Sequence, residues 1–207
     1  MPHLCHRSAA TVRRIGIALI CGALLTSSAC ADDSNTTVNA FDELQRPGSL
    51  STLTVCHGFG CRLQTSVDLL SSDRAAMTRI MRGAGSSAAE REAIAAVVAW
   101  FDRRVGPIAG TQHHIAKARG GNVTNTDHQF DCIDTSHNTT VLLFALADMK
   151  LLRHHRVAQP VSRAQPHTTA VVTEIANGRQ WAVDAWTHAA GQRPDVLPLE
   201  QWFARSD

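Results

Sequence analysis

The chain has 207 residues, of which 44% are hydrophobic, and a formal net charge of +2 at neutral pH. The positive excess comes from residues 1–29, which carry Arg7, Arg13 and Arg14 and no acidic side chain. The remainder is nearly neutral and has no long run of Lys or Arg, so its charge does not predict binding to nucleic acid, and its length suits one domain with a hydrophobic core.

The N-terminus has the pattern of an export signal. An apolar run over residues 15–25 follows the basic residues and is shorter than a membrane-spanning helix. Two processing routes fit the small residues that come next. A lipoprotein signal of residues 1–29 would be cut before Cys30, which would carry the lipid, whereas ordinary cleavage would follow Ala29-Cys30-Ala31. We expect an exported, periplasmic protein, attached to a membrane by lipid at Cys30, with residues 30–50 as a polar tether.

Residues 51–207 are predicted to form the folded domain, which opens with a Gly-rich loop. Cys56 and Cys61 enclose the sequence His-Gly-Phe-Gly. In an oxidising compartment this pair favours a disulfide over a metal or redox pair, because a redox pair usually has two intervening residues. Cys132 is then the odd thiol of the domain. It is a candidate reactive cysteine, with an inert buried cysteine as the alternative.

Two helices and a loop are predicted next. The first helix covers residues 68–82 and ends at the glycines that follow. The second begins at Ser87, which should form a capping box with Glu90, and continues at helical spacing until Gly106-Pro107 stops it. Residues 108–130 are polar and rich in glycine and predict a long loop.

The last third of the chain predicts a buried helix and a hairpin. The helix covers residues 132–153, and its second half is almost wholly apolar. Residues 168–175 and 180–186 have the composition of strands, and Asn177-Gly178 between them is a hairpin signal. Helices followed by antiparallel strands predict an α+β domain.

Cys132, His167 and Asp184 follow one another in the order of a nucleophile, a base and a group that orients the base. Asp131 is well placed as the N-cap of the helix, so Cys132 would be its first residue, where free N–H groups favour a thiolate. We therefore expect the Cys132 pKa to lie below the usual value of about 8.5. His167 would exchange protons with the thiol, and Asp184 would fix the imidazole tautomer.

This arrangement resembles the transglutaminase-like cysteine peptidase superfamily, particularly its bacterial members. The resemblance rests on Asp-Cys-Ile-Asp at residues 131–134, on the strand that opens at His167, and on Trp-Ala-Val-Asp at 181–184. It covers roughly residues 87–203. It implies a papain-like fold with a central buried helix packed on an antiparallel sheet, and a Cys132–His167–Asp184 triad without a cofactor. It also implies a peptide or protein substrate with an amide bond, hydrolysed rather than cross-linked.

The hairpin geometry raises one difficulty for this triad. If Asn177 and Gly178 are the two loop residues, Asp184 lies four residues, about 13 Å, along the sheet from His167. A bulge, a shifted turn or a bend would bring them together, or else His188 would replace His167.

The remaining polar residues give weaker indications of function. Gln129 is a candidate side-chain donor to an oxyanion. The pairs His113-His114 and His154-His155 should be solvated surface rather than metal ligands, because adjacent side chains point apart. Two rivals to the enzyme remain, namely a catalytically silent scaffold or binding domain and a periplasmic metal-binding protein that would explain the 11 histidines.

Overall fold

A computed structural model describes residues 51–164 and 166–206 of the chain. All of these described residues belong to one compact unit. The predicted export signal, the lipid attachment at Cys30 and the tether up to residue 50 lie outside the described residues. Among the residues described, no helix combines the length and apolar character needed to cross a membrane.

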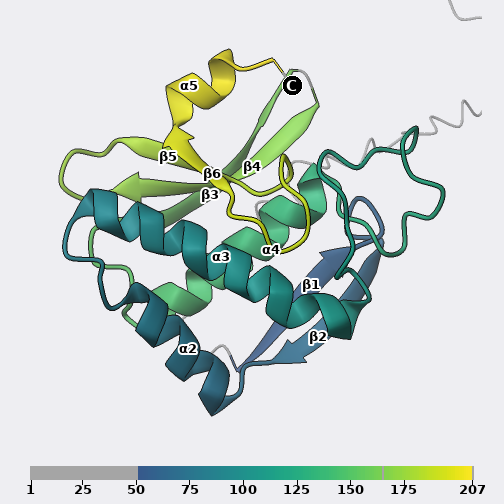
Figure 1. Ribbon diagram of the computed structural model, residues 1–207. Helices are drawn as coiled ribbons and strands as arrows, with labels where there is room; N and C mark the ends of the chain where they lie inside the picture. Colours follow the sequence, from purple (N-terminus) through teal and green to yellow (C-terminus); the bar gives the residue numbers. More distant parts are fainter. Residues whose placement is uncertain (1–50, 165, 207) are drawn as a thin grey trace, which may run out of the picture. The chain divides into compact units, whose positions relative to one another are not determined.

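The described residues form two antiparallel sheets and four helices (Figure 1), which confirms the α+β class. The first sheet pairs β1 with β2, and the second has the order β3-β4-β5-β6. In chain order the elements are β1 (Thr52–His57), β2 (Leu63–Asp68), α2 (Ser71–Met81), α3 (Ser87–Ala109), α4 (Cys132–Asp148), β3 (His155–Arg163), β4 (His167–Glu174), β5 (Gln180–Asp184), β6 (Asp195–Pro198) and α5 (Leu199–Ala204).

The prediction that helices precede strands is wrong, because the β1–β2 hairpin comes first. Cys56 at the end of β1 and Cys61 in the turn are joined by a disulfide, with their Cα atoms 4.5 Å apart. The pairing expected from the Gly-rich loop is therefore present in the structure. The sequence does not signal this hairpin clearly, since alternate residues of β2 are exposed and polar.

The two middle helices differ from the prediction at their ends. Ser86, not Ser87, caps α3 by accepting the N–H of Ala89 at 3.2 Å. Glu90 is released from the expected capping box and instead binds the chain before β3. The helix continues through Pro107 to Ala109, because loss of one backbone donor near a helix end leaves the rest of the ladder intact.

Helix α4 is the central element of the domain. It contacts β1 on one side and β3, β4 and β5 on the other, and residues 138–146 are all buried. Its apolar side chains join Ala170 and Val172 of β4 in the main core. A second, smaller cluster lies on the opposite face of the sheet, where Val171 of β4 meets Trp202 of α5. Strand β4 is therefore covered on both faces.

The β4–β5 register differs from the simple two-residue hairpin. Ala170 pairs with Val183, and Thr173 pairs with Gln180. The N–H of Gly178 donates to the carbonyl of Glu174 across a four-residue loop, and Gly178 takes a positive φ of 74°. This register moves Asp184 two residues closer to His167 than the sequence predicts. The shifted turn thus halves the separation of about 13 Å expected from two loop residues.

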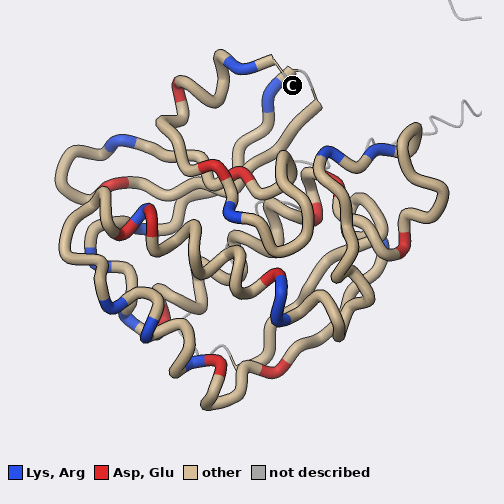
Figure 2. Tube along the Cα trace, in the orientation of Figure 1, with Lys and Arg blue, Asp and Glu red and all other residues tan. Residues whose placement is uncertain are grey.

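Charged residues of both signs are interspersed along the described chain (Figure 2). Several form exposed ion pairs, such as Arg193 with Glu92 and Arg205 with Asp195.

Candidate active site

Cys132 is the first residue of α4, as its cap predicts. Asp131 adopts an extended conformation and accepts the N–H of Asp134 at 2.9 Å. Asp134 reaches back to the N–H of Asp131 at 3.2 Å, which completes a capping box. The half-buried thiol of Cys132 is the only free cysteine among the described residues.

The disulfide loop is anchored to the same helix end. The N–H groups of Phe59 and Cys61 donate to Asp134 at 2.9 and 2.6 Å, and the N–H of Gly60 donates to Asp131 at 2.8 Å. Residues 58–61 all have positive φ, a left-handed run that turns successive N–H groups towards an anion. The two carboxylates thus hold both the loop and the start of α4 in place.

The ionisation of Asp134 should make the stability of the fold depend on pH. Burial and the neighbouring charge of Asp131 raise the pKa of Asp134 to about 7, although the three backbone N–H groups oppose the rise. A carboxyl group whose pKa is raised on folding stabilises the fold while protonated, so this contribution falls as pH rises from about 4 to 7.

We therefore expect Asp134→Asn to flatten the decline in unfolding free energy between pH 5 and 7. The slope that one group can contribute is at most about 1.4 kcal/mol per pH unit. Urea unfolding at several pH values measures it, and Asp148→Asn, at an exposed position in the last turn of α4, is the control. An unchanged slope in Asp134→Asn would contradict the raised pKa.

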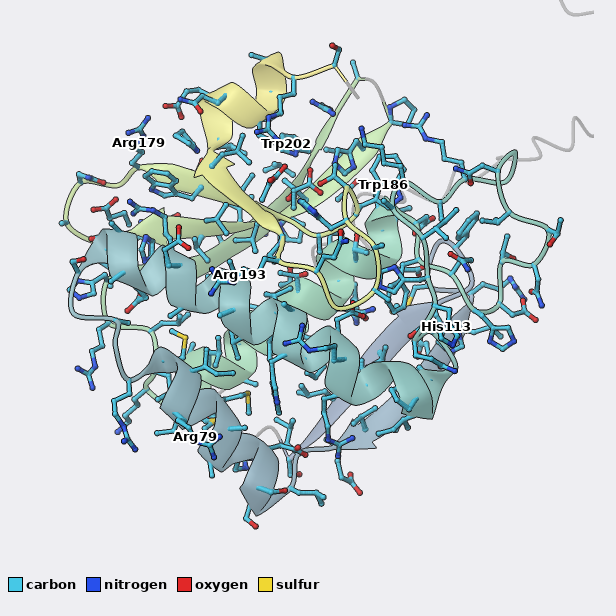
Figure 3. All side chains as sticks on the ribbon, viewed as in Figure 1. Arg79, His113, Arg179, Trp186, Arg193 and Trp202 are labelled. Atoms are coloured by element: carbon cyan, nitrogen blue, oxygen red, sulfur yellow. A yellow bond between two sulfur atoms is a disulfide. The ribbon has the colours of Figure 1, made fainter. Side chains whose placement is uncertain are left out.

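His167 and Asp184 form a buried hydrogen-bonded pair. The His167 Nε2 and Asp184 Oδ2 atoms lie 2.6 Å apart, and both side chains are almost inaccessible to solvent. Trp202 donates its indole N–H to the same carboxylate oxygen at 2.8 Å. The rings of Trp186 and Trp202 pack against the imidazole, with centroids 4.6 and 5.2 Å away. Figure 3 labels both tryptophans, which come from the segment that follows β5 and from α5.

Cys132 contacts the backbone of β4 next to His167. By strand alternation His167 lies on the same side of β4 as Val171, towards α5, whereas α4 covers the other side. The β4–β5 ladder stops at Ala170 and Val183, so the N–H of Thr168 lies beyond it. That N–H donates to the sulfur of Cys132. Cys132 therefore contacts the residue that directly follows His167.

The electrostatics of Cys132 differ from the expectation of a low pKa. Burial raises the pKa of the Cys132 thiol above its usual value, and the charges of Asp131 and Asp184 act in the same direction. The N–H groups of Thr168 and of Cys132 itself oppose the rise but do not outweigh burial. The helix terminus supplies the N–H donors that the sequence predicts. The carboxylates of Asp131 and Asp184, however, disfavour a negative charge on the Cys132 sulfur.

Alkylation by iodoacetamide tests this state directly. Because the thiolate is the reactive form, labelling of Cys132 in the resting protein should be slow at pH 7 and should rise through pH 9. Asp131→Asn should move the profile to lower pH by removing one repulsive charge, and Asp148→Asn should leave it unchanged. Fast labelling that is already complete at pH 6 would show a preformed thiolate.

The other candidates have separate roles in the structure. The Gln129 side-chain oxygen accepts the N–H of Ile115 at 2.9 Å, which leaves its NH2 group as the donor end. His188 lies 3.3 Å from Asp195 and is not the partner of Asp184. The prediction of solvated histidine pairs is wrong for His114 and His155, which are 5% and 2% exposed. Each is buried against an acidic residue of α3, Asp102 or Glu90.

Trp202 is a partner of the site that the sequence does not predict. Its only sequence signal is an aromatic residue in a short apolar segment, and the contact depends on α5 folding back over β5. No cluster of three or more metal-ligating side chains occurs among the residues the structure describes. Comparison with known protein families, with curated proteins and with solved structures finds no match to this chain.

Proposed function

We propose that the protein is a thiol-dependent acyl-transfer enzyme that hydrolyses amide bonds, with Cys132 as nucleophile. The observation that carries this proposal is the buried His167–Asp184 pair, 2.6 Å apart. The residue after His167 donates its backbone N–H to the sulfur of Cys132, at a helix N-terminus. A pair of this kind orients an imidazole and stabilises its protonated form. The resemblance to transglutaminase-like cysteine peptidases and a papain-like fold is part of the same proposal.

The geometry suggests which nitrogen acts as the base. Nε2 of His167 donates to Asp184, so Nδ1 is the basic nitrogen of the neutral ring. The thiol of Cys132 rests protonated because its pKa is raised. His167 would therefore take the thiol proton as the sulfur attacks the amide carbonyl, rather than hold a ready thiolate–imidazolium pair.

The remaining steps of the reaction begin once His167 has taken the thiol proton. The new C–S bond forms as the carbonyl oxygen becomes an oxyanion, and the imidazolium then protonates the leaving amine as the C–N bond breaks. Water, deprotonated by His167, hydrolyses the thioester and releases a carboxylic acid and the thiol. The N–H of Cys132 and the NH2 group of Gln129 are the candidate donors to the oxyanion.

Export is a separate part of the proposal. A disulfide in the domain is typical of oxidising compartments. We propose a periplasmic protein whose substrate is a peptide or protein, with lipid at Cys30 as its membrane attachment. Cys30→Ser should release the protein from the membrane fraction, whereas wild-type protein that begins at Asp32 would contradict lipid attachment.

Trapping of the acyl-enzyme tests the activity. The full chain is incubated with activated peptide esters and peptide amides, and the peptide that contains Cys132 is weighed by mass spectrometry. We expect an acyl adduct in wild-type protein and none in Cys132→Ala. His167→Ala should lose the adduct and amide turnover, whereas the matched change His188→Ala should keep both.

The raised thiol pKa favours one alternative, a catalytically silent binding domain. In that case Cys132 would remain unacylated by every activated ester, and His167→Ala would change stability without changing any thiol reaction. Equal behaviour of His167→Ala and His188→Ala in acylation would therefore support the silent domain over the enzyme.

A further inference from the structure

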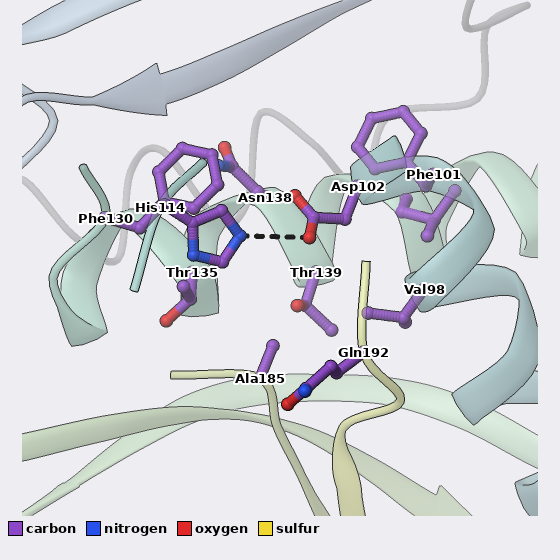
Figure 4. Close-up of a pocket in the computed structure, with 11 residues that line it drawn as sticks. Val98, Phe101, Asp102, His114, Phe130, Thr135, Asn138, Thr139, Ala185 and Gln192 are labelled. Atoms are coloured by element: carbon purple, nitrogen blue, oxygen red, sulfur yellow. Dashed lines mark hydrogen bonds and ion pairs between the residues drawn. The ribbon is translucent and has the colours of Figure 1, made fainter. Parts of the chain in front are cut away.

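A partly open pocket (Figure 4) is lined by Ala185, the residue that follows Asp184 of the proposed triad. Apolar side chains of α3 and α4 form much of its wall, including Phe101 and Leu142, and Phe130 closes one side. The space it encloses is about 400 Å³ including the open solvent at its mouth. Neither Cys132 nor His167 lines it.

The pocket is one helical turn from the nucleophile. Thr135, Thr139 and Leu142 line it, and they continue along α4 the stripe on which Cys132 lies. One turn of helix is about 5 Å. Ala185, the residue after Asp184, lines the opposite side. A group attached near a carbonyl at Cys132 is therefore close enough to enter the pocket.

One carboxylate gives the pocket its charge. Asp102 is the only carboxylate among the lining residues, and no Lys or Arg lines the pocket. Its Oδ2 atom lies 2.9 Å from His114 Nε2 and 2.5 Å from the N–H of Gly191. Two of roughly four acceptor positions are thus used. Arg103, the next residue of α3, is hydrogen-bonded to the carbonyl of Gly191 instead.

We propose that this pocket binds a short cationic side chain of the substrate, carried next to the carbonyl that Cys132 attacks, and that Asp102 selects it. That the bound group belongs to a substrate rests on the proposed function. An ammonium group on a short aliphatic stem suits apolar and aromatic walls with a single carboxylate. An anionic side chain would meet Asp102 with no Lys or Arg among the described lining residues to offset the repulsion.

Labelling of Cys132 with small methanethiosulfonates tests the pocket without requiring hydrolysis. The thiolate of Cys132 attacks the reagent sulfur, forms a mixed disulfide and expels methanesulfinate, while the thiol proton passes to solvent. The probes are the 2-aminoethyl, ethyl and 2-sulfonatoethyl reagents, which share a two-carbon stem and differ in charge. Rates are measured on the full chain by the mass of the Cys132 peptide.

We expect the aminoethyl reagent to react fastest and the sulfonatoethyl reagent slowest. Asp131 and Asp184 also attract cations, so the decisive quantity is how a variant changes the aminoethyl-to-ethyl ratio. Asp102→Asn should lower that ratio about tenfold, the size of one charge-assisted hydrogen bond. Asp148→Asn, with the same charge change at the other end of α4, should leave it within about twofold.

Gln192→Lys provides a second variant at an exposed position of the pocket's rim, should Asp102→Asn fail to fold. The new ammonium group should also lower the aminoethyl-to-ethyl ratio. Ratios unchanged in the folded variants would overturn the pocket proposal, even if peptide amides are hydrolysed. Conversely, a ratio that depends on Asp102 in a protein without acyl-enzyme would overturn the proposed function and keep the cationic pocket.

Discussion

Asp184→Asn should lower the rate of Cys132 acylation by roughly 10⁴-fold, the loss typical when the acid of a triad becomes an amide. The carboxylate oxygen Oδ2 accepts from both His167 Nε2 and the Trp202 indole N–H. An Asn side chain can present its oxygen to these two donors but carries no charge to stabilise an imidazolium. If the NH2 group of the Asn faces His167 instead, Nε2 must act as the acceptor. Nδ1 then carries the proton, so it cannot take a proton from the thiol.

Single-turnover acylation with an activated peptide ester measures this effect, because it isolates the step in which His167 takes the proton. Asp195→Asn is the matched control, since it removes the carboxylate next to His188 and should change acylation by less than about threefold. Circular dichroism and urea unfolding check that both variants fold. Equal acylation rates in the two variants would exclude Asp184 from the proposed mechanism.

Trp202→Phe measures how much the indole N–H contributes to acylation by binding the Asp184 carboxylate. The Phe ring keeps most of the packing against His167 but loses the indole N–H, so the carboxylate keeps only the imidazole donor. We expect a smaller loss of acylation than in Asp184→Asn, about tenfold, the size of one hydrogen bond to a charged group. Loss of acylation as large as in Asp184→Asn, in a folded protein, would show that the indole N–H is indispensable for holding the carboxylate.

The candidate triad could be predicted because each member has a local signal. Asp131 before Cys132 is a helix start, and His167 and Asp184 lie on strands whose composition is clear. Their mutual distance could not be predicted from the same signals. Asn177-Gly178 suggests a two-residue loop, but the structure uses a longer loop with Gly178 at positive φ, and this one change decides whether the pair can meet.

Partners from distant parts of the chain explain most of the differences from the sequence analysis. His114 and His155 look like surface residues because their neighbours in sequence are polar. Asp102 and Glu90, both on α3, bury them. A local pattern carries no information about such an acid 12 or 65 residues away. The same reason hides Trp202, whose contact with Asp184 requires β6 and α5 to return across the sheet.

Glu90→Ala should lower the free energy of unfolding by about 3–5 kcal/mol, the cost of breaking one side of a buried ionic hydrogen-bond network. Glu90 is fully buried, and its carboxylate accepts the backbone N–H groups of Arg153 and His155 at 2.8 and 2.9 Å. It also lies 3.0 Å from His155 Nδ1. Alanine would leave these donors buried without an acceptor and would release the segment that starts β3.

The pH dependence of stability provides a second measurement of the role of Glu90. Burial opposes the charge of Glu90, but hydrogen bonds from His155 and from the backbone outweigh it and hold the pKa below its usual value of 4.5. A carboxyl group whose pKa is lowered on folding stabilises the fold above that value, and the contribution is lost as pH falls through the folded pKa. Wild-type protein should therefore lose this part of its stability on acidification below about pH 4.5, and Glu90→Ala should lack that loss.

Urea unfolding at pH 7 and at several values between 3 and 5 measures both effects. Glu92→Ala is the matched control, because its side chain is 78% exposed and its ion pair with Arg193 lies at the surface. We expect that control to change stability by less than about 1 kcal/mol. If Glu90→Ala is no more damaging than Glu92→Ala, then α3 and the start of β3 are held together by the core side chains alone, and the buried His155 must find another acceptor or remain uncharged.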